Sequence, residues 1–149
     1  MVDVVDRATR SRMMSGIRGG DTKPEIEVRS ALHRQGLRFR LHGSSLPGRP
    51  DLVFPKYNAV IFVHGCFWHG HDCKYFRLPA TQRPFWKRKI EGNRKRDARN
   101  KLLLAAAGWR AMAVWECALR GKSVTARAQL TERLARWVRG KRRQGEFRG

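Results

Sequence analysis

The segment from Leu46 to Cys73 carries most of the side chains in this sequence that could perform chemistry. It contains Asp51 directly after a loop rich in proline and glycine, three histidines, two of the chain's three cysteines, and the aromatic pair Phe67 and Trp68. Carboxylate, imidazole and thiolate groups are the usual protein ligands of metal ions. We interpret this segment as a metal-dependent active site beside a structural metal site.

Every cysteine of the chain and one histidine together supply the four sulfur and nitrogen ligands that a structural zinc ion prefers. We predict a zinc site formed by Cys66, His71, Cys73 and Cys117. Their spacing matches no standard zinc finger, and the alternative is three ordinary buried thiols with a histidine at the surface. A loop held by zinc would be rigid, and it would fix the direction of the side chains of residues 67–69.

Asp51 is the candidate ligand of a second, catalytic metal ion, because Mg²⁺ prefers oxygen ligands. A cation and a general base are what the hydrolysis of a phosphodiester requires. The backbone carbonyl of Val63 would complete the metal site, and His69 suits the base because histidine exchanges protons near neutral pH. Glu25 would orient the imidazole of His69, and His64 would contact phosphate or water. The structural alternative is that Pro-Asp is a common turn dipeptide and that single histidines are usually surface residues.

Hydrophobic periodicity predicts the elements around these residues. Strands are expected at 37–42, 51–54, 59–63 and 109–115, and helices at 6–17, 22–35, 84–107 and 125–139. The loop at 55–58 would join two strands as a hairpin that pairs Phe54 with Ala59. In that register one face of the sheet carries Asp51, Val53, Val60, Phe62 and His64. The order of elements predicts a single α/β domain with a mixed sheet and helices on both faces.

The same patterns predict which parts of the helices are buried. Glu25 lies on the apolar stripe of its helix with Val28 and Leu32, which favours a position facing the site. The long helix is basic over its first turns, where it carries Lys89 and Arg96, whereas residues 102–107 are apolar and expected to be buried. On the last helix the inward positions are Leu130, Leu134, Trp137 and Val138. We divide the chain into a basic arm at 1–20, a core at 21–140 and a frayed basic tail at 141–149.

The chain of 149 residues contains 33 lysine and arginine residues against 12 aspartate and glutamate residues, a formal net charge of +21. A small domain needs a net charge of only about 2–8 for solubility, so nucleic acid is the expected partner. An anionic membrane fits less well, because the charge is spread along the whole chain. No apolar run reaches about 20 residues, and the first residues do not resemble a signal peptide. We therefore expect a cytoplasmic protein without membrane contact.

The arm at residues 1–20 combines several arginines with the apolar side chains of Met14 and Ile17. Gly19 and Gly20 end it and would form a hinge. Two roles remain open for it from composition alone: a clamp on DNA, or packing on the body of the protein.

Four stretches closely resemble the very-short-patch repair (Vsr) endonucleases: residues 8–11, 46–51, 60–69 and 108–121. The resemblance extends over nearly the whole chain, to about Val138. It implies a restriction-endonuclease-like fold and an enzyme that nicks double-stranded DNA 5′ of the thymine in a T:G mismatch, the lesion left by deamination of 5-methylcytosine. It also implies a functional link to a cytosine-5 DNA methyltransferase, and a single nick suits a monomer.

By position, the resemblance makes Asp51 the shared ligand of Mg²⁺ ions, with the carbonyl of Val63, and His69 the general base, supported by Glu25 and His64. It assigns zinc to the four ligands predicted above. The residues that match its aromatic wedge in the major groove are Phe67, Trp68 and Trp86. Those that match the arm entering from the minor groove are Met14 and Ile17.

Four positions depart from related patterns. Restriction enzymes usually carry an acid, one residue and a lysine on the strand after the aspartate, whereas Phe62 and His64 stand there, a departure that the Vsr family shares. Val63 stands where threonine is frequent in the family, which is harmless if only the carbonyl binds metal. Gly70 replaces a histidine and leaves His69 and His71 in place.

A rival hypothesis of another class is a zinc-stapled DNA-binding module without catalysis, in which the basic helix grips phosphates and the histidines are incidental. Both hypotheses predict zinc and salt-dependent DNA binding, so neither property separates them. Nicking of a T:G duplex separates the two hypotheses, because only the enzyme would cut it.

Overall fold

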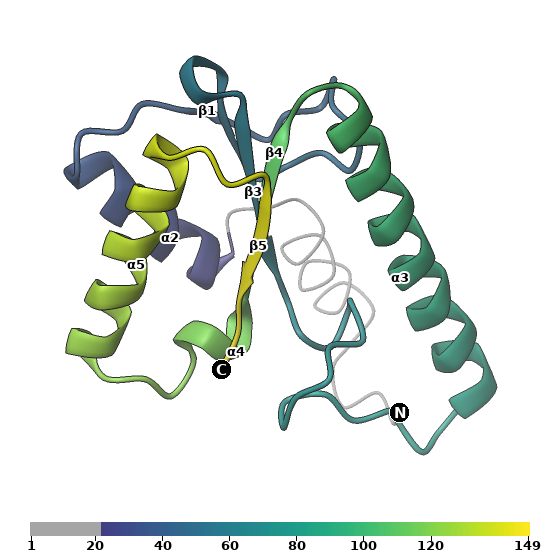
Figure 1. The fold of residues 1–149 in the computed structure, drawn as a ribbon. Coiled ribbons are helices and arrows are strands. Elements are labelled where there is room, and N and C mark those ends of the chain that lie inside the picture. Colours follow the sequence, from purple (N-terminus) through teal and green to yellow (C-terminus); the bar gives the residue numbers. More distant parts are fainter. Residues whose placement is uncertain (1–21) are drawn as a thin grey trace, which may run out of the picture.

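A five-stranded mixed sheet forms the centre of the structure (Figure 1). Its strands are Arg40–Leu41 (β1), Leu52–Phe54 (β2), Ala59–His64 (β3), Arg110–Trp115 (β4) and Gln144–Phe147 (β5). They lie side by side in this order; β1, β2 and β3 are antiparallel neighbours, and β4 runs parallel to both β3 and β5. The computed structural model describes residues 22–149. The expected basic arm, with Met14 and Ile17, lies outside the described residues.

Helices cover both faces of this sheet, as the sequence predicts. The helices α2 (Lys23–Arg34) and α5 (Val124–Arg139) lie together on one face, and α3 (Arg83–Ala106) lies on the other (Figure 1). A short α4 (Glu116–Leu119) follows β4, and a 3-10 turn, η1 (Pro55–Tyr57), joins β2 to β3. The α/β class with a mixed sheet is therefore confirmed. Within residues 22–149 no helix is long and apolar enough to span a membrane.

The hydrophobic core is divided by the sheet into a large and a small cluster. The large cluster joins the sheet to α2 and α5, and its fully buried members include Leu32, Leu52, Phe54, Ile61, Leu134 and Val138. The small cluster lies under α3 and consists of Val53, Val60, Leu104 and Ala111, with Phe62 partly buried against it. The division follows from the alternation of side chains along a strand. The predicted common face of Val53, Val60 and Phe62 is confirmed.

The predicted hairpin is present in the predicted register. Phe54 pairs with Ala59, and Leu52 pairs with Ile61. The turn between them ends at Asn58, whose φ of 49° is left-handed, a conformation that asparagine tolerates better than most residues. The strand expected at 37–42 is shorter, because only Arg40–Leu41 pairs with β2.

Side-chain caps begin the two helices of the large cluster. The hydroxyl of Thr22 accepts a hydrogen bond from the backbone N–H of Glu25 at 3.4 Å, and the hydroxyl of Ser123 accepts one from Ala126 at 3.1 Å. Such caps satisfy N–H groups that have no partner within the helix. The inward residues predicted for α5 are all buried, namely Leu130, Leu134, Trp137 and Val138. On α2 the cap places Glu25 in the first turn, facing inward.

The expected burial of residues 102–107 on α3 is wrong. Leu102 is 72% exposed and Leu103 is 44% exposed, and only Leu104 is fully buried. The other buried residue of this helix is Ile90, almost four turns earlier on the same stripe. A straight helix that crosses a twisted sheet touches it along one line, so neighbours of Leu104 point to solvent. α3 therefore rests on the sheet by a narrow apolar strip.

The expectation of a frayed tail is also wrong. Residues 144–147 form β5, which adds to the sheet in parallel with β4. Phe147 packs against the large cluster, and the guanidinium of Arg133 lies over its ring at 4.8 Å. The sequence of β5 has no apolar run. An edge strand can form without one, because it buries only part of one face. Its pairing partner, rather than its composition, makes it a strand.

The narrow contact of α3 predicts a strong contrast between two adjacent leucines. Leu104→Ala removes a fully buried side chain from a small cluster and is expected to lower the free energy of unfolding by about 2–5 kcal/mol. Leu102→Ala, its matched control at the exposed neighbour, should change it by no more than about 0.5 kcal/mol. Urea unfolding of both variants measures this difference, and equal losses would contradict the packing described for α3.

Candidate active site and metal cluster

Asp51 lies where the pairing of β2 with β3 ends. The last backbone pair is Leu52 with Ile61, and the carbonyl of Pro50 already accepts a hydrogen bond from Gly43 at 2.9 Å. The N–H of Val63, one step further along β3, instead donates to Oδ2 of Asp51 at 2.6 Å. The side chain of Asp51 thus replaces a backbone acceptor. Because the N–H and C=O of one strand residue point to the same side, the carbonyl of Val63 also faces the side of Asp51.

Burial raises the pKa of the Asp51 carboxyl from 3.8 to about 6. The hydrogen bond from Val63 opposes this shift, the negative charge of Glu25 adds to it, and His42 and His69 oppose it. These charges act on Asp51 because the three side chains surround it. The structure therefore brings the predicted residues Asp51, Glu25 and His69 into one region.

The imidazole that Glu25 holds is that of His42, and the expected hydrogen bond from Glu25 to His69 is absent from the contacts of the described residues. Glu25 is only 1% exposed, and its carboxylate lies 2.8 Å from Nε2 of His42 and 3.6 Å from the guanidinium of Arg29. His42 follows the short β1, where β1 runs beside the end of β2. Sequence reasoning did not single out His42.

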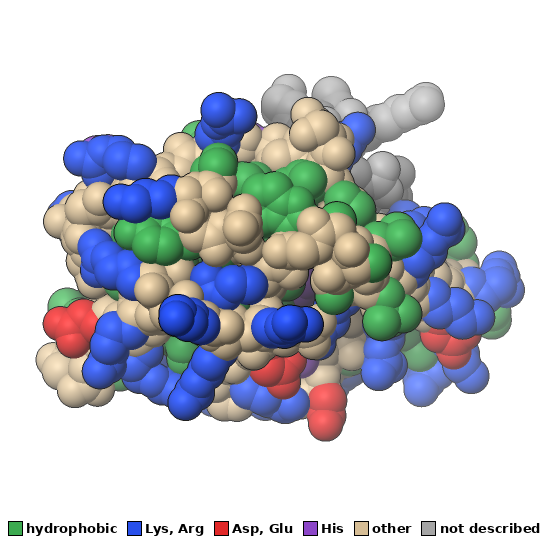
Figure 2. All heavy atoms as spheres, turned by 45° about the horizontal axis from the view of Figure 1, so that its top comes forward, with side chains coloured by type: hydrophobic (Ala, Val, Ile, Leu, Met, Phe, Trp, Pro, Cys, Tyr) green, Lys and Arg blue, Asp and Glu red, His purple; other side chains and the backbone are tan. Residues whose placement is uncertain are grey.

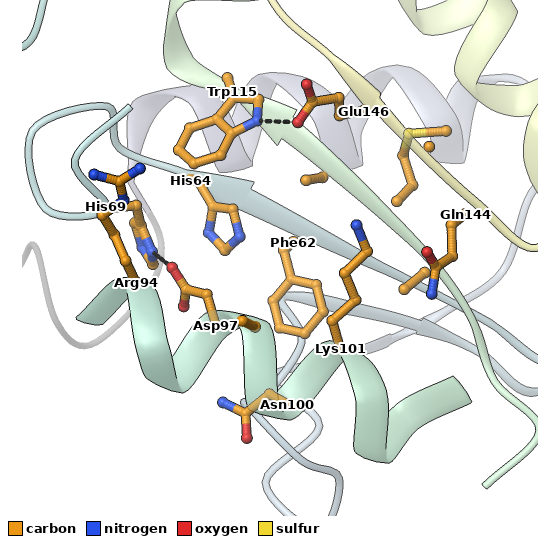
Figure 3. A pocket seen from close by; sticks show the side chains of 15 residues that line it. Phe62, His64, His69, Arg94, Asp97, Asn100, Lys101, Trp115, Gln144 and Glu146 are labelled. Carbon is orange, nitrogen blue, oxygen red and sulfur yellow. Dashed lines mark hydrogen bonds and ion pairs between the residues drawn. The ribbon is translucent and has the colours of Figure 1, made fainter. Parts of the chain in front are cut away.

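The carboxylate that holds His69 belongs to Asp97 on α3. Nδ1 of His69 lies 2.5 Å from Oδ2 of Asp97, and both residues are half-buried (Figure 3). Asp97 was missed in the sequence, although one signal was available: it is the single acid between Arg94 and Arg99 in the most basic stretch of the helix. A single acid among so many cations suggests a specific partner, and here that partner is the imidazole of His69.

His64 completes this group. Its ring lies 3.9 Å from that of His69 and stacks on Phe62 at 5.4 Å between ring centroids. Burial lowers the pKa of His64 well below 6.5, with His69 and His71 as further causes. A neutral imidazole offers one hydrogen-bond donor and one acceptor rather than a positive charge.

A cavity of about 470 Å³ opens between α3 and the β4–β5 part of the sheet, and we refer to it as the α3–β4 cavity. The side chains of Ala111 and Ala113 leave its floor hollow. His64, His69 and Asp97 lie at one end of this cavity in Figure 3. His64 and His69 are therefore open to this cavity, whereas Asp51 and Glu25 are not among the residues that line it.

The four predicted zinc ligands come together. One ligand atom from each of Cys66, His71, Cys73 and Cys117 lies within 4.8 Å of all the others. In a tetrahedral site with Zn–S bonds of about 2.3 Å the sulfurs stand about 3.8 Å apart, so this cluster fits zinc with little adjustment. Sγ of Cys117 already lies 3.4 Å from Nδ1 of His71.

The surroundings of the cluster also fit a metal ion. Cys66, His71 and Cys117 are buried, and all three cysteines are free thiols. Burial lowers the pKa of His71, which favours the neutral imidazole that a metal requires. Its Nε2 is buried without a hydrogen-bond partner among the described residues, an arrangement that costs free energy unless the ring serves another purpose.

Three aromatic side chains gather beside this cluster. The ring centroid of Phe67 lies 5.2 Å from that of Trp68 and 5.4 Å from that of Trp86, and the two tryptophans are 5.8 Å apart. All three are half-buried. Asn93 of α3 donates a hydrogen bond to the carbonyl of Trp68 at 2.7 Å, which ties the loop to the helix. We call these three residues the ring cluster.

Positive charge predominates on the surface of the protein. In Figure 2, lysine and arginine side chains lie around a central hydrophobic area, and acidic side chains are few on that face. Lys89 and Arg96 belong to α3; Lys89 is half-buried, and Arg96 is exposed and donates a hydrogen bond to Asn93. The helix that supplies Asp97 thus presents cations to solvent.

The fold and the site indicate a nuclease: an α/β domain that combines a half-buried aspartate at a strand end with a histidine–aspartate pair and a large excess of cations. Residues 2–75 match the family model described as DNA mismatch endonuclease Vsr. The chain belongs to the Vsr family of DNA mismatch endonucleases, and its fold is of the restriction-endonuclease-like type.

Curated relatives agree with this assignment. The chain is 51% identical over 140 residues to the DNA mismatch endonuclease Vsr of Escherichia coli (strain K12), which covers 94% of this chain and 90% of the relative. It is 50% identical over 119 residues to the Type II nicking enzyme V.XorIIP of Xanthomonas oryzae pv. oryzae, covering 80% and 88%. It is 40% identical to the Type II nicking enzyme V.NmeAIP of Neisseria meningitidis, covering 93% and 96%.

The raised pKa of Asp51 predicts that this residue costs stability when it is charged. Its carboxyl holds a proton up to about pH 6 in the folded protein and only up to about pH 4 when unfolded, so stability falls as the pH rises between these values. Asp51→Asn is therefore expected to be more stable than the wild type above pH 6, by at most about 3 kcal/mol, since each pKa unit corresponds to about 1.4 kcal/mol.

Urea unfolding at pH 4 and pH 8 without added magnesium measures this difference. The advantage of Asp51→Asn should shrink toward pH 4. Glu132→Gln, which neutralises an exposed carboxylate on α5, is the control and should change stability little at either pH. An Asp51→Asn protein less stable than the wild type at pH 8 would contradict this account.

Proposed function

We propose that this protein is a Mg²⁺-dependent endonuclease that nicks double-stranded DNA 5′ of the thymine in a T:G mismatch formed by deamination of 5-methylcytosine. The observation that carries the proposal is a half-buried Asp51 that lies within the electrostatic influence of His69, together with the contact of His69 with Asp97. The same region then offers a ligand for a cation and a base for water. The relatives are named as a mismatch endonuclease and as nicking enzymes, which supports the choice of DNA as substrate.

His69 is the general base in this proposal. Its Nδ1 is engaged by Asp97, so Nε2 is the nitrogen that accepts the proton of the attacking water. The carboxylate of Asp97 fixes the imidazole and stabilises the imidazolium that forms, as in other histidine–aspartate pairs. Asp97 is therefore the positioning residue in the role first expected of Glu25. His64, neutral through burial, hydrogen-bonds water or phosphate.

Asp51 and the carbonyl of Val63 are the groups that would hold Mg²⁺. When bound there, Mg²⁺ supplies positive charge to the scissile phosphate and to the leaving oxygen. Both groups lie on the same side of β3, and the buried carboxylate favours a cation, because its charge is poorly solvated. Glu25 adds negative charge to this region and holds His42 next to Asp51.

The second cluster would hold a structural zinc ion, with Cys66, His71, Cys73 and Cys117 as its four ligands. Three sulfurs and one imidazole suit zinc better than magnesium. The ion would join residues 66–73 to the end of β4. It would thereby hold the ring cluster in place.

The ring cluster is the proposed wedge for the mismatch. A T:G pair is easier to unstack than a matched pair, and unstacking costs a few kcal/mol that aromatic stacking offsets. Three rings in mutual contact form a preorganised surface for that purpose. Lys89 and Arg96 would bind phosphates, and Met14 and Ile17 of the arm would enter from the minor groove. The net charge of +21 strengthens all of these contacts.

The biological setting follows from the substrate. T:G pairs of this origin arise where a cytosine-5 DNA methyltransferase has acted, so we propose a functional link to such an enzyme. The nicking reaction takes place on DNA in the cytoplasm, and one active site acting on one strand is consistent with a monomer.

A nicking assay tests the proposed activity. The wild type should nick a T:G duplex in the presence of Mg²⁺, leave the matched T:A duplex intact, and stop when no Mg²⁺ is supplied. Asp51→Asn keeps the shape of the side chain but removes the charge that binds the cation, so nicking should fall by at least about 1000-fold. Wild type that binds the T:G duplex and never nicks it would instead establish a DNA-binding module without catalysis.

The wedge is tested by Trp68→Ala. Aromatic stacking is worth about 1–3 kcal/mol per base, so the preference of binding for T:G over T:A should fall about 10-fold or more, while binding to the T:A duplex changes little. Trp109→Ala is the matched control. Trp109 is also half-buried, but it lies directly before β4 and outside the ring cluster. Equal losses on both duplexes would show that Trp68 is only structural.

A further inference from the structure

We propose that Trp115 is a positioning residue that transmits the geometry of the metal cluster to the two catalytic imidazoles, and that Glu146 on the last strand holds its indole in place. This inference rests on the proposed function. It concerns a side chain that acts through the imidazoles of His64 and His69.

Trp115 stacks on one of the metal-ligand candidates. Its ring lies 3.9 Å from the imidazole of His71, and the two planes differ by only 11°. Two residues further on, Cys117 supplies another member of the cluster. A metal ion bound by His71 and Cys117 would therefore hold the indole in two ways: through the imidazole stacked on it, and through the backbone that joins Trp115 to Cys117.

The same indole contacts both imidazoles of the site. Trp115 is the register partner of His64 in the parallel pair of β3 with β4, and their ring centroids are 4.9 Å apart. The ring of His69 lies 6.1 Å away in an edge-on arrangement. His64 and His69 contact each other at 3.9 Å, so the indole supports a pair of rings rather than one. Its rotation would displace both.

Glu146 fixes the remaining freedom of the ring. Its carboxylate accepts a hydrogen bond from Nε1 of Trp115 at 3.1 Å, across the α3–β4 cavity wall formed by β4 and β5 (Figure 3). The chain after Glu146 returns to the metal cluster, where the N–H of Gly149 donates to Sγ of Cys117 at 3.3 Å and Arg148 donates to the carbonyl of Asp72. The last strand thus holds both the indole and the cluster.

Simple core packing does not explain this position. Trp115 is half-buried and belongs to neither hydrophobic cluster of the described residues. Within residues 22–149, the ring contacts and the side-chain hydrogen bond of its indole involve three imidazoles and one carboxylate. A tryptophan in such surroundings orients polar rings, since its flat face stacks and its N–H bonds in a defined direction.

Single-turnover nicking at saturating T:G DNA tests the inference. Trp115→Leu should lower the rate constant about 10- to 100-fold, because small misplacements of a base are costly, while DNA affinity and zinc content stay as in the wild type. Trp115→Phe keeps a ring against His71 and loses only the N–H bond, so a loss of about fivefold is expected. Trp109→Leu is the control and should keep the wild-type rate.

A second pair of variants separates the role of Glu146 from general destabilisation. Glu146→Ala should behave like Trp115→Phe, and Glu146→Gln, which retains an acceptor oxygen, should recover the lost rate. In protein with ¹³C-labelled histidine, the ring resonances of His64 and His69 should move in Trp115→Leu and stay in Trp109→Leu. This signature requires no nicking, so it tests the inference even if the proposed substrate is wrong.

Two results would overturn the proposal: Trp115→Leu nicking at the wild-type rate, or unchanged resonances of His64 and His69. If Trp115→Leu loses its zinc or fails to fold, Trp115→Phe with full zinc decides. A slower Trp115→Phe supports the inference, and a wild-type rate rejects it.

Discussion

One half-buried carboxyl at the place where the pairing of two strands ends constrains the site. Asp51 accepts the hydrogen bond of Val63 that no backbone carbonyl takes, and it does so with little water around it. A carboxylate in that position is unstable alone. The neighbouring imidazoles of His42 and His69 stabilise it, and a cation would stabilise it further. The site is therefore built around a carboxyl whose charged form costs stability in the fold.

The two faces of the sheet differ in how they are packed. The large cluster with α2 and α5 contains most of the buried apolar side chains of the described residues. α3 is attached to the other face mainly by Ile90 and Leu104, so most of its circumference is free for cations. Asp97 is the exception that points back to the sheet. A helix held by a narrow strip can thus face DNA and still deliver one carboxylate to the active site.

The segment from 64 to 73 serves three purposes at once. It supplies two imidazoles to the α3–β4 cavity, three ligands to the metal cluster and two members of the ring cluster. Such different groups stay in register because the segment is anchored at both ends, by β3 and by the cluster that reaches Cys117. The two anchors therefore hold the ring cluster and the two imidazoles in a fixed arrangement relative to each other.

Much of this architecture is determined by local sequence. The alternation of residues 51–64 determines the hairpin, its register and its two faces, because the side-chain period of a strand is two. The apolar stripe on α5 is also a local pattern. The cysteine–histidine set can be recognised from residue types alone, because zinc accepts few ligand types. The tertiary structure alone decided that Asp97 holds His69, that Glu25 holds His42, and that residues 144–147 become a strand. The first pairing depends on the angle at which α3 crosses the sheet, the second on the placement of α2 next to the residue that follows β1, and the third on the free edge of β4. No local periodicity encodes any of them.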